Sequence, residues 1–243
     1  MPHRPKFSTC LVKMFLAAFL CLFPVSSRAG NNPDALGQEE IKEAERLLSE
    51  LGYWTGPIDG LPDEATQHAT LAFQRVANLP ATGLLKSVEL SALRRASPIR
   101  PRLNGPFHLE VDVSRQIIFM VEPDGRITHA LPIATGSGKW FKEGGRRRRA
   151  TTPLGTFTVR RKIEGWRQSP LGLMYYPSYI QGGVAIHGSR KLPRHPATFG
   201  CIAVPLFAAE TMSEHMPVGT VVIVYKNSKQ DRSQFRPTSF LSL

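Results

Sequence analysis

The sequence predicts a two-part fold, in which a small bundle of three helices precedes a mainly β domain built as a sandwich or barrel with long loops. Three observations lead to this prediction. Apolar residues recur at helical spacing over residues 38–96, they alternate at a period of two from residue 107 onward, and a proline-rich segment over 97–106 separates the two patterns. With 243 residues, 42% of them hydrophobic, the chain is long and apolar enough for two modest domains with cores of their own.

The N-terminal segment has the layout of a secretory signal peptide. A basic stretch precedes the apolar run Met14 to Val25, and Ser27-Arg28-Ala29 fits the small-x-small pattern of a cleavage site. We expect residues 1–29 to direct secretion across the inner membrane and then to be removed, which would leave no stable membrane span. An uncleaved N-terminal anchor is the alternative, although this apolar run is short for a transmembrane helix.

The charge balance indicates an anionic partner outside the cytoplasm. The chain carries 31 Lys and Arg against 19 Asp and Glu, a net charge of +12. Cleavage after residue 29 removes four basic residues and no acidic ones, so the mature chain keeps 27 against 19, or +8. Such a charge suits nucleic acid, a membrane surface or an acidic polymer, but export argues against nucleic acid and favours an anionic envelope polymer. Export also leaves Cys201 as the one cysteine of the mature chain, which excludes a disulfide framework within it.

Three helices are expected in residues 38–96. The first runs from Gln38 to Leu51 with an amphipathic pattern, the second from Glu64 to Ala77 and the third from Ser87 to Leu93. Glycine and proline in residues 52–60 mark a turn-rich loop between the first two helices. No catalytic group stands out in this segment, so we expect a binding module, with a plain helical spacer as the alternative.

Short motifs in this segment resemble the small peptidoglycan-binding domain of cell-wall enzymes. In that domain a helix is followed by an LGY and DG loop, a second helix that ends in FQ, and a TG turn. The matching residues are Leu51-Gly52-Tyr53, Gly56, Ile58-Asp59-Gly60, Thr66, Ala72-Phe73-Gln74 and Thr82-Gly83. The resemblance covers residues 38–93 and implies that the bundle binds peptidoglycan, through its glycan or its stem peptides.

The β domain is expected over residues 107–225, after a stiff linker over 97–106 and before a C-terminal tail over 226–243. A hairpin turn is expected at Pro123-Asp124-Gly125, and the expected strands are 109–113, 117–121, 127–134, 156–159, 184–186 and 221–225. Arg146 to Arg149 is expected as a solvated charge run in a loop. A contact of this run with an anionic wall polymer or phospholipid is the alternative.

His187 and Cys201 are the residues best suited to catalysis. A thiolate is a strong nucleophile, and an imidazole at the end of a predicted strand could take the thiol proton and return it later. Gly200 allows a tight turn before the cysteine, which would bring main-chain N–H groups toward an oxyanion. On spacing alone, a structural cysteine and a core histidine fit the sequence equally well. A zinc site made from His187, His195 and Cys201 lacks a fourth ligand, so no metal is expected.

Ordered motifs across residues 107–225 resemble the L,D-transpeptidase (YkuD-type) catalytic domain. The matching segments, in chain order, are Leu109-Glu110-Val111-Asp112, Thr135-Gly136, residues 152–157 (TPLGTF), 169–172 (SPLG), 182–188 (GGVAIHG) and Thr198-x-Gly200-Cys201-Ile202. The resemblance implies a YkuD-type β-sandwich with long loops. It also implies an exported enzyme that cross-links peptidoglycan and needs no metal or organic cofactor.

The same resemblance assigns roles to individual residues. Cys201 would attack the bond between a diamino acid and the terminal D-Ala of a stem peptide, forming an acyl-enzyme. His187 would act first as base and then as acid, oriented by the carbonyl group of Gly188. The N–H groups of Gly200 and Cys201 would hold the oxyanion, and Thr198 would shape the cysteine loop.

Two residues depart from the family pattern, because Phe199 replaces a histidine and Ala203 replaces an arginine. The lost guanidinium would weaken either the binding of an anionic substrate or the rigidity of the loop, and Arg190 or Arg194 in the preceding loop is the candidate substitute. Tyr175-Tyr176, beside the active-site strand, is expected to line the substrate groove.

The leading hypothesis is therefore a secreted L,D-transpeptidase of the periplasm or cell wall. The same Cys–His chemistry with water as acceptor gives an L,D-carboxypeptidase, and with a protein as acceptor it gives protein-to-wall attachment. The two departures from the family pattern keep another hypothesis open, which is a non-catalytic peptidoglycan-binding protein.

Overall fold

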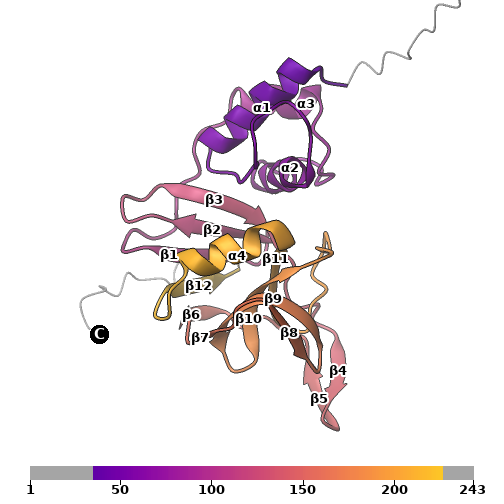
Figure 1. Ribbon diagram of the computed structural model, residues 1–243, viewed down its shortest axis with the longest axis vertical. Helices are drawn as coiled ribbons and strands as arrows, with labels where there is room; N and C mark the ends of the chain where they lie inside the picture. The colour runs from indigo at the N-terminus through magenta and orange to yellow at the C-terminus, as the bar shows by residue number, and fades with distance from the viewer. Residues whose placement is uncertain (1–34, 227–243) are drawn as a thin grey trace, which may run out of the picture. The chain divides into compact units, whose positions relative to one another are not determined.

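The computed structural model describes residues 35–226 (Figure 1). The expected signal peptide, residues 1–29, and residues 227–243 of the expected tail lie outside the described residues. No helix within residues 35–226 is long and apolar enough to cross a membrane. This part of the chain forms a helical bundle, followed by a β-sandwich that carries one further helix.

Three short helices form the bundle: α1 (Gln38–Glu50), α2 (Glu64–Val76) and α3 (Ser87–Leu93). The three predicted helices are thus confirmed to within one residue at each end. Helix α2 begins where the Asp63 side chain accepts a hydrogen bond from the Thr66 N–H at 2.7 Å, which satisfies a donor that the first turn leaves free. Apolar residues on the inner faces of the helices, including Leu48, Phe73 and Leu90, pack into one core.

A buried carboxylate holds the loop between α1 and α2. Glu45 accepts hydrogen bonds from the N–H groups of Asp59 (3.1 Å) and Gly60 (2.9 Å), and from the Thr66 hydroxyl (3.0 Å). A buried carboxylate needs such partners, because an unpaired one would be costly. The DG motif of this loop therefore has a structural role, which is to supply N–H donors to Glu45.

The first sheet of the sandwich has the strand order β3-β2-β1-β12-β6, with β1 parallel to β12 and the other neighbours antiparallel. Its strands are β1 (His108–Asp112), β2 (Ile117–Val121), β3 (Ile127–Pro132), β6 (Gly155–Thr158) and β12 (Val221–Tyr225). All five confirm strands that the sequence predicts, within two residues at each end.

The second sheet has the order β11-β10-β9-β7, with β8 paired to β9. Its strands are β7 (Arg161–Lys162), β8 (Trp166–Ser169), β9 (Gly172–Gln181), β10 (Val184–Ser189) and β11 (Ile202–Pro205), and helix α4 (Leu206–His215) follows β11. Apolar residues from both sheets and from α4 form the sandwich core, among them Leu109, Met120, Ile186, Ile202 and Met212. The predicted mainly β sandwich is confirmed, although the pattern predicts β10 alone among the strands of this sheet.

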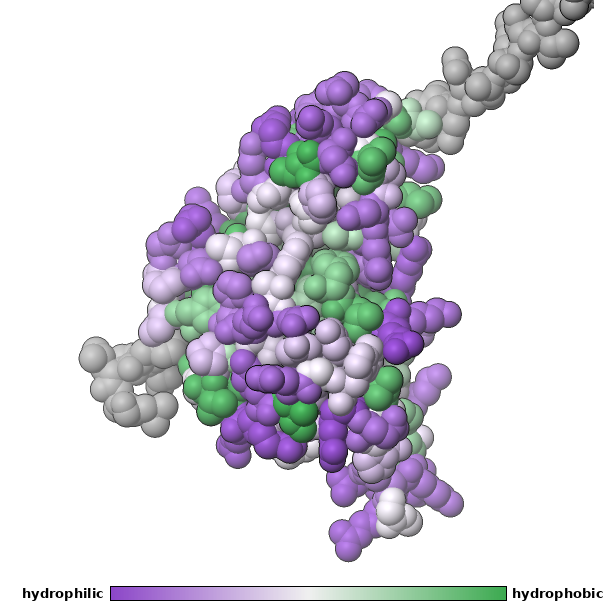
Figure 2. All heavy atoms as spheres, viewed as in Figure 1, coloured by the Kyte–Doolittle hydropathy of each residue, from purple (hydrophilic) through white to green (hydrophobic). Residues whose placement is uncertain are grey.

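Arg146 to Arg149 lies in a strand, so the expected loop is wrong here. Strands β4 (Trp140–Glu143) and β5 (Arg146–Arg149) form an antiparallel hairpin. Gly144 and Gly145 both have positive φ (55° and 77°), which is the backbone that a two-residue hairpin turn requires. Figure 2 shows hydrophilic side chains over this hairpin, in agreement with the full exposure of β5.

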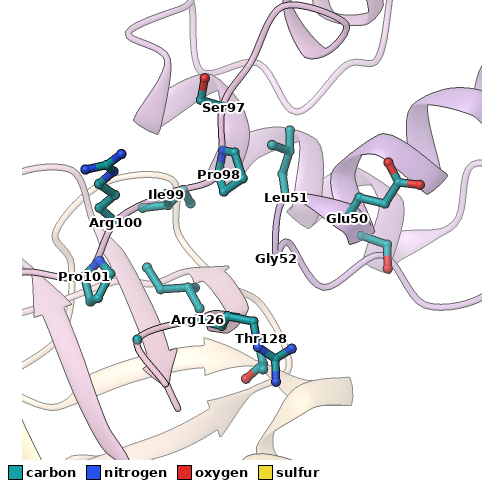
Figure 3. Close-up of a pocket in the computed structure, with 13 residues that line it drawn as sticks. Glu50, Leu51, Gly52, Ser97, Pro98, Ile99, Arg100, Pro101, Arg126 and Thr128 are labelled. Carbon is teal, nitrogen blue, oxygen red and sulfur yellow. The ribbon is translucent and has the colours of Figure 1, made fainter. Parts of the chain in front are cut away.

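The helical bundle and the first sheet share one core. Ile117, Phe119 and Val121 of β2 belong to the same buried cluster as the apolar residues of the bundle. The backbone also connects the two parts, because the Ala130 N–H donates to the Gly52 carbonyl at 2.7 Å. A cavity of about 550 Å³ lies at this junction, between the end of α1, the expected linker and the turn from β2 to β3 (Figure 3). The segment over 97–106 thus runs along a packed junction.

Candidate active site

Two parallel strands bring the predicted catalytic residues together. In the pairing of β10 with β11, Ile186 lies opposite Ile202 and His187 lies opposite Ala203. Side chains alternate between faces along a strand, so the two isoleucines enter the sandwich core and their neighbours lie on the outer face. Cys201, directly before β11, lines the same groove as His187. Parallel pairing thus joins two residues that are far apart in the sequence.

The outer face of the second sheet is hollowed into a groove of about 610 Å³. His187, Thr198 and Cys201 all line it, so three of the predicted site residues surround one cavity. The β4–β5 hairpin, the region of β8 and β9, and the loop from β10 to β11 supply its walls. The groove is basic, because its charged side chains are Arg148, Arg149, Arg167 and Lys191 against Glu143.

The imidazole of His187 is held in one tautomer. Its Nδ1 donates to the Gly188 carbonyl oxygen at 3.0 Å, and because a carbonyl only accepts, the neutral ring keeps its lone pair on Nε2. Burial lowers the pKa of His187, against a smaller opposing effect of the Gly188 hydrogen bond, so the ring is neutral at neutral pH. Position 188 has no room for a side chain, because a Cβ there would lie 2.6 Å from the Cβ of Ala209. The histidine lies within β10 and not at its end, since the strand continues to Ser189.

The Cys201 side chain is a free, partly buried thiol. Its Sγ donates to the carbonyl oxygen of Gly183 at 3.7 Å. Burial raises the pKa of this thiol, and a backbone hydrogen bond from Ala185 opposes that rise only in part. The resting side chain is therefore protonated and needs a base before it can act as a nucleophile. Within residues 35–226, no three His, Cys, Asp or Glu side chains are placed to hold a metal ion.

Two threonines fix the loop that presents the cysteine. The Thr198 hydroxyl donates to the Cys201 carbonyl (2.6 Å) and accepts from the Gly200 N–H (3.1 Å). From the other side, the Thr152 hydroxyl donates to the Gly200 carbonyl (2.9 Å) and accepts from the Gly136 N–H (2.9 Å). Gly200 itself has φ 131°, a conformation that a side chain would strain. Because its N–H is bonded to Thr198, Gly200 does not present a free donor to an oxyanion.

The two residues that depart from the family pattern both lie on the groove. Phe199 is 48% exposed, and its ring packs on Phe141 of the hairpin with 4.9 Å between ring centroids. Ala203 is buried, and its backbone exchanges two hydrogen bonds with Ala134, at 2.9 and 3.0 Å. Phe199 therefore supplies an aromatic contact to the hairpin. Because position 203 is an alanine, the cations of the groove come from elements other than β11.

Three other predicted substrate-binding residues do not line the groove. The hydroxyls of Tyr175 and Tyr176 donate to Glu210 of α4 at 3.3 and 2.6 Å. The hydrogen bond to Glu210 raises the pKa of Tyr176 to about 12. The Arg190 guanidinium stacks on Trp166, 4.8 Å from the ring centroid. These residues organise the surroundings of β9 and do not face the thiol.

The motifs of the sequence do not identify the basic residues that line the groove. Arg148 and Arg149 belong to a run expected to be solvated, and Arg167 and Lys191 belong to no motif. One signal was present, because the Gly144-Gly145 pair between two short segments is typical of a hairpin turn. Recognising the hairpin places these arginines on an exposed two-stranded ribbon instead of in a loop.

Family models match both parts of the chain. Residues 106–224 match the model of the L,D-transpeptidase catalytic domain (YkuD), and residues 37–93 match that of a peptidoglycan binding domain. Both matches fall on the segments whose motifs carry the corresponding resemblance.

Individual proteins are similar to this chain as well. The L,D-transpeptidase of Xylanimonas cellulosilytica, solved over its residues 123–326, is 36% identical with a TM-score of 0.72, covering 76% of this chain and 93% of that one. An L,D-transpeptidase of Stackebrandtia nassauensis is 21% identical with a TM-score of 0.46, covering 79% and 93%. Among curated proteins, the localization factor PodJL of Caulobacter vibrioides is 46% identical over 63 residues, which are 26% of this chain. The chain spans only 6% of the length of PodJL.

Proposed function

Because this chain belongs to the L,D-transpeptidase family, we propose that it is an exported enzyme that cross-links peptidoglycan through a cysteine acyl-enzyme. Membership rests on the match of the catalytic domain and on the similarity to the Xylanimonas enzyme. The helical bundle matches peptidoglycan binding domains, so peptidoglycan is the partner, and a periplasmic or cell-wall location follows from both domains. The expected signal peptide over residues 1–29 supports export.

The proposed reaction begins with transfer of the Cys201 thiol proton to Nε2 of His187. The hydrogen bond from Nδ1 to Gly188 leaves Nε2 as the basic nitrogen of the ring. The resulting thiolate attacks the carbonyl carbon of the diamino acid in a tetrapeptide stem and forms a carbon–sulfur bond. Since the Gly200 N–H is bonded to Thr198, we assign the Cys201 N–H to the developing oxyanion.

Collapse of the tetrahedral intermediate then breaks the bond to the terminal D-Ala. The imidazolium of His187 returns its proton to the leaving amine, so D-Ala departs and a thioester remains on Cys201. The side-chain amine of a diamino acid on a second stem next gives a proton to His187 and attacks the thioester. This step forms the cross-link and restores the thiol.

The charge of the groove supports a stem peptide as substrate. Stem peptides carry carboxylates, which the basic residues that line the groove would attract and orient. Arg148 of the hairpin and Arg167 of β8 lie on separate elements of that lining. We propose that these arginines replace the guanidinium that Ala203 lacks.

The observation that carries the proposal is the shared groove of Cys201 and His187, with the imidazole fixed by Gly188. In the test, protein lacking residues 1–29 is incubated with tetrapeptide muropeptides, and products and intact protein are analysed by mass spectrometry. We expect free D-Ala, dimers joined between two diamino acids and an acyl adduct on Cys201, none of which should form with Cys201→Ala.

Other outcomes separate the alternatives. Trimmed monomers without dimers would identify an L,D-carboxypeptidase that uses the same thiol. Binding to sacculi without any adduct would identify a non-catalytic peptidoglycan-binding protein. Full activity in Cys201→Ala would overturn the cysteine mechanism.

A further inference from the structure

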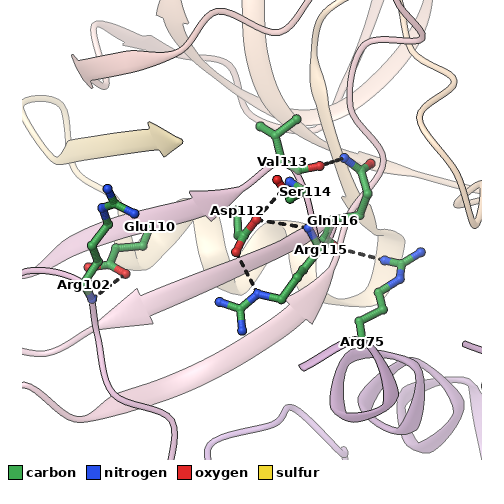
Figure 4. A network of polar contacts seen from close by, with 8 residues as sticks. All are labelled: Arg75, Arg102, Glu110, Asp112, Val113, Ser114, Arg115 and Gln116. Carbon is green, nitrogen blue, oxygen red and sulfur yellow. Dashed lines mark hydrogen bonds and ion pairs between the residues drawn. The ribbon is translucent and has the colours of Figure 1, made fainter. Parts of the chain in front are cut away.

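A guanidinium of the helical bundle reaches the β-sandwich beside the cysteine loop. Arg75 lies in the last turn of α2, and its Nη1 donates to the carbonyl groups of Gln116 (2.7 Å) and Ile133 (3.4 Å). Its Nη2 donates to the carbonyl of Arg194 at 2.9 Å. These acceptors precede β2, follow β3 and lie in the loop from β10 to β11. One side chain thus connects the bundle to three segments of the sandwich, and Figure 4 shows it reaching Gln116.

The contacts of Arg75 suit a role in fixing backbone geometry. Within residues 35–226 its hydrogen bonds go to carbonyl groups, and no carboxylate forms an ion pair with it. Burial, and to a lesser degree the charge of Arg194, lowers the pKa of Arg75 to about 10. Arg75 is partly buried, and a cation withdrawn from water without a counter-charge is costly compared with an apolar side chain. Its planar fork of donors, however, can hold several backbone segments in one arrangement.

A second chain of hydrogen bonds connects Arg75 to the cysteine loop, and it passes through Gln116. This residue is buried and has a left-handed backbone (φ 56°), which is strained for a residue other than glycine. Its side-chain amide donates to the Thr135 hydroxyl (2.7 Å) and accepts from the Thr135 N–H (2.9 Å). The Thr135 carbonyl accepts in turn from the N–H groups of Ala197 (2.9 Å) and Thr198 (3.0 Å). Both the direct hydrogen bond to Arg194 and the chain through Gln116 therefore end in the loop from β10 to β11, which carries Cys201.

From these contacts we propose that Arg75 is a positioning residue for Cys201, so that the docked bundle holds the loop from β10 to β11 in the geometry that acylation requires. The proposal rests on the proposed role of Cys201 as nucleophile. The bundle would then have two functions, which are to bind the wall and to position the cysteine loop. Removing the guanidinium would loosen the cysteine loop. The acylation rate of Cys201 would then fall even with a small substrate that makes no contact with the bundle. A residue that acts on wall binding alone would leave such a reaction unchanged.

The test uses the chain without residues 1–29 and three variants of it. Arg75→Met removes the guanidinium, Arg75→Lys keeps the charge, and Arg46→Met is the matched control. Arg46 is exposed on α1 and pairs with Glu50 at 2.6 Å, so its loss leaves the cysteine loop untouched. Acylation of Cys201 by a carbapenem and its alkylation by iodoacetamide are followed by intact mass. Pelleting with sacculi and thermal unfolding are measured on the same samples.

We expect Arg75→Met to lower the second-order rate of acylation on the order of 10-fold and to change the alkylation rate, with sacculus binding unchanged. Arg75→Lys should recover part of the rate, and Arg46→Met should match the wild type. A folded Arg75→Met protein with wild-type acylation, or one that loses only sacculus binding, would overturn the proposal. If Arg75→Met does not fold, a wild-type rate in Arg75→Lys would overturn it. If the wild type is not acylated at all, the proposed function fails, while the alkylation rates still test the position of the loop.

Discussion

The two sheets share a core but differ in what covers their outer faces. On the first sheet every residue of β1 and β2 is buried. The helical bundle packs on Phe119 and its neighbours in β2, whereas Glu110 of β1 is bonded to the backbone of Arg102 in the segment that follows the bundle. On the second sheet the outer face of β10 and β11 is open and forms the groove that contains His187 and Cys201. The proposed chemistry is therefore confined to the face that the bundle leaves uncovered.

Polar groups on the two faces are satisfied in different ways. On β1, Glu110 accepts two hydrogen bonds from the Arg102 N–H (2.7 and 2.9 Å), and Asp112 accepts from the Arg115 N–H and Nε (3.0 and 2.7 Å; Figure 4). These acids have their partners within the chain, so the LEVD motif that contains them is structural. The Cys201 thiol, in contrast, has a long contact of 3.7 Å to a carbonyl group, which leaves it available for reaction.

The largest effect is expected from a change on the open face. His187→Gln removes the proposed base and keeps a polar side chain, and a general base contributes roughly 10²–10⁴-fold to a rate. We expect the second-order rate of carbapenem acylation to fall by about that factor, with little change in Tm because the groove is not a packed core. Intact-mass kinetics and thermal unfolding measure the two quantities. A loss of less than about 10-fold would remove His187 from the role of base.

The next effect is expected from the covered face. Phe119 is 1% exposed and belongs to the core that the bundle and the first sheet share. Phe119→Ala should lower the free energy of unfolding by about 3–5 kcal/mol and leave the acylation rate of the folded protein unchanged. Val88→Ala is the control, since Val88 is 58% exposed and its truncation should cost less than about 0.5 kcal/mol. Urea denaturation followed by fluorescence would contradict a shared core if the bundle and the sandwich unfolded in two separate transitions.

The covered and open faces also differ in how far the sequence predicts them. Burial imposes a regular spacing of apolar residues, so the bundle and the first sheet follow from periodicity. The β4–β5 hairpin and β8 are exposed and polar, so no period identifies them, and Arg148 and Arg167 were missed as groove residues. Tyr176 was expected in the groove, but it bonds to Glu210 on α4, a helix that the pattern does not predict. Cys201 and His187 are identified by their chemistry together with the family motifs around them, since the strand pairing that joins them is set by contacts far apart in the sequence.

The dependence of the acylation rate on pH is the smallest expected effect. It distinguishes proton transfer from Cys201 to His187 from a reaction of the free thiolate alone. Burial lowers the pKa of His187 below its ordinary value of about 6.5 and raises the pKa of the Cys201 thiol. A base must be unprotonated, so its active fraction rises as pH increases through the pKa of His187 and is complete at neutral pH. The second-order rate of acylation should therefore change little between about pH 7 and 8, and should fall toward lower pH, where His187 becomes protonated, by at most about tenfold per pH unit. In His187→Gln only the free thiolate can react, so its rate should instead climb by about tenfold per pH unit across the same range. A wild-type rate with that same climb would contradict proton transfer to the imidazole, because the thiolate alone would then account for the reaction.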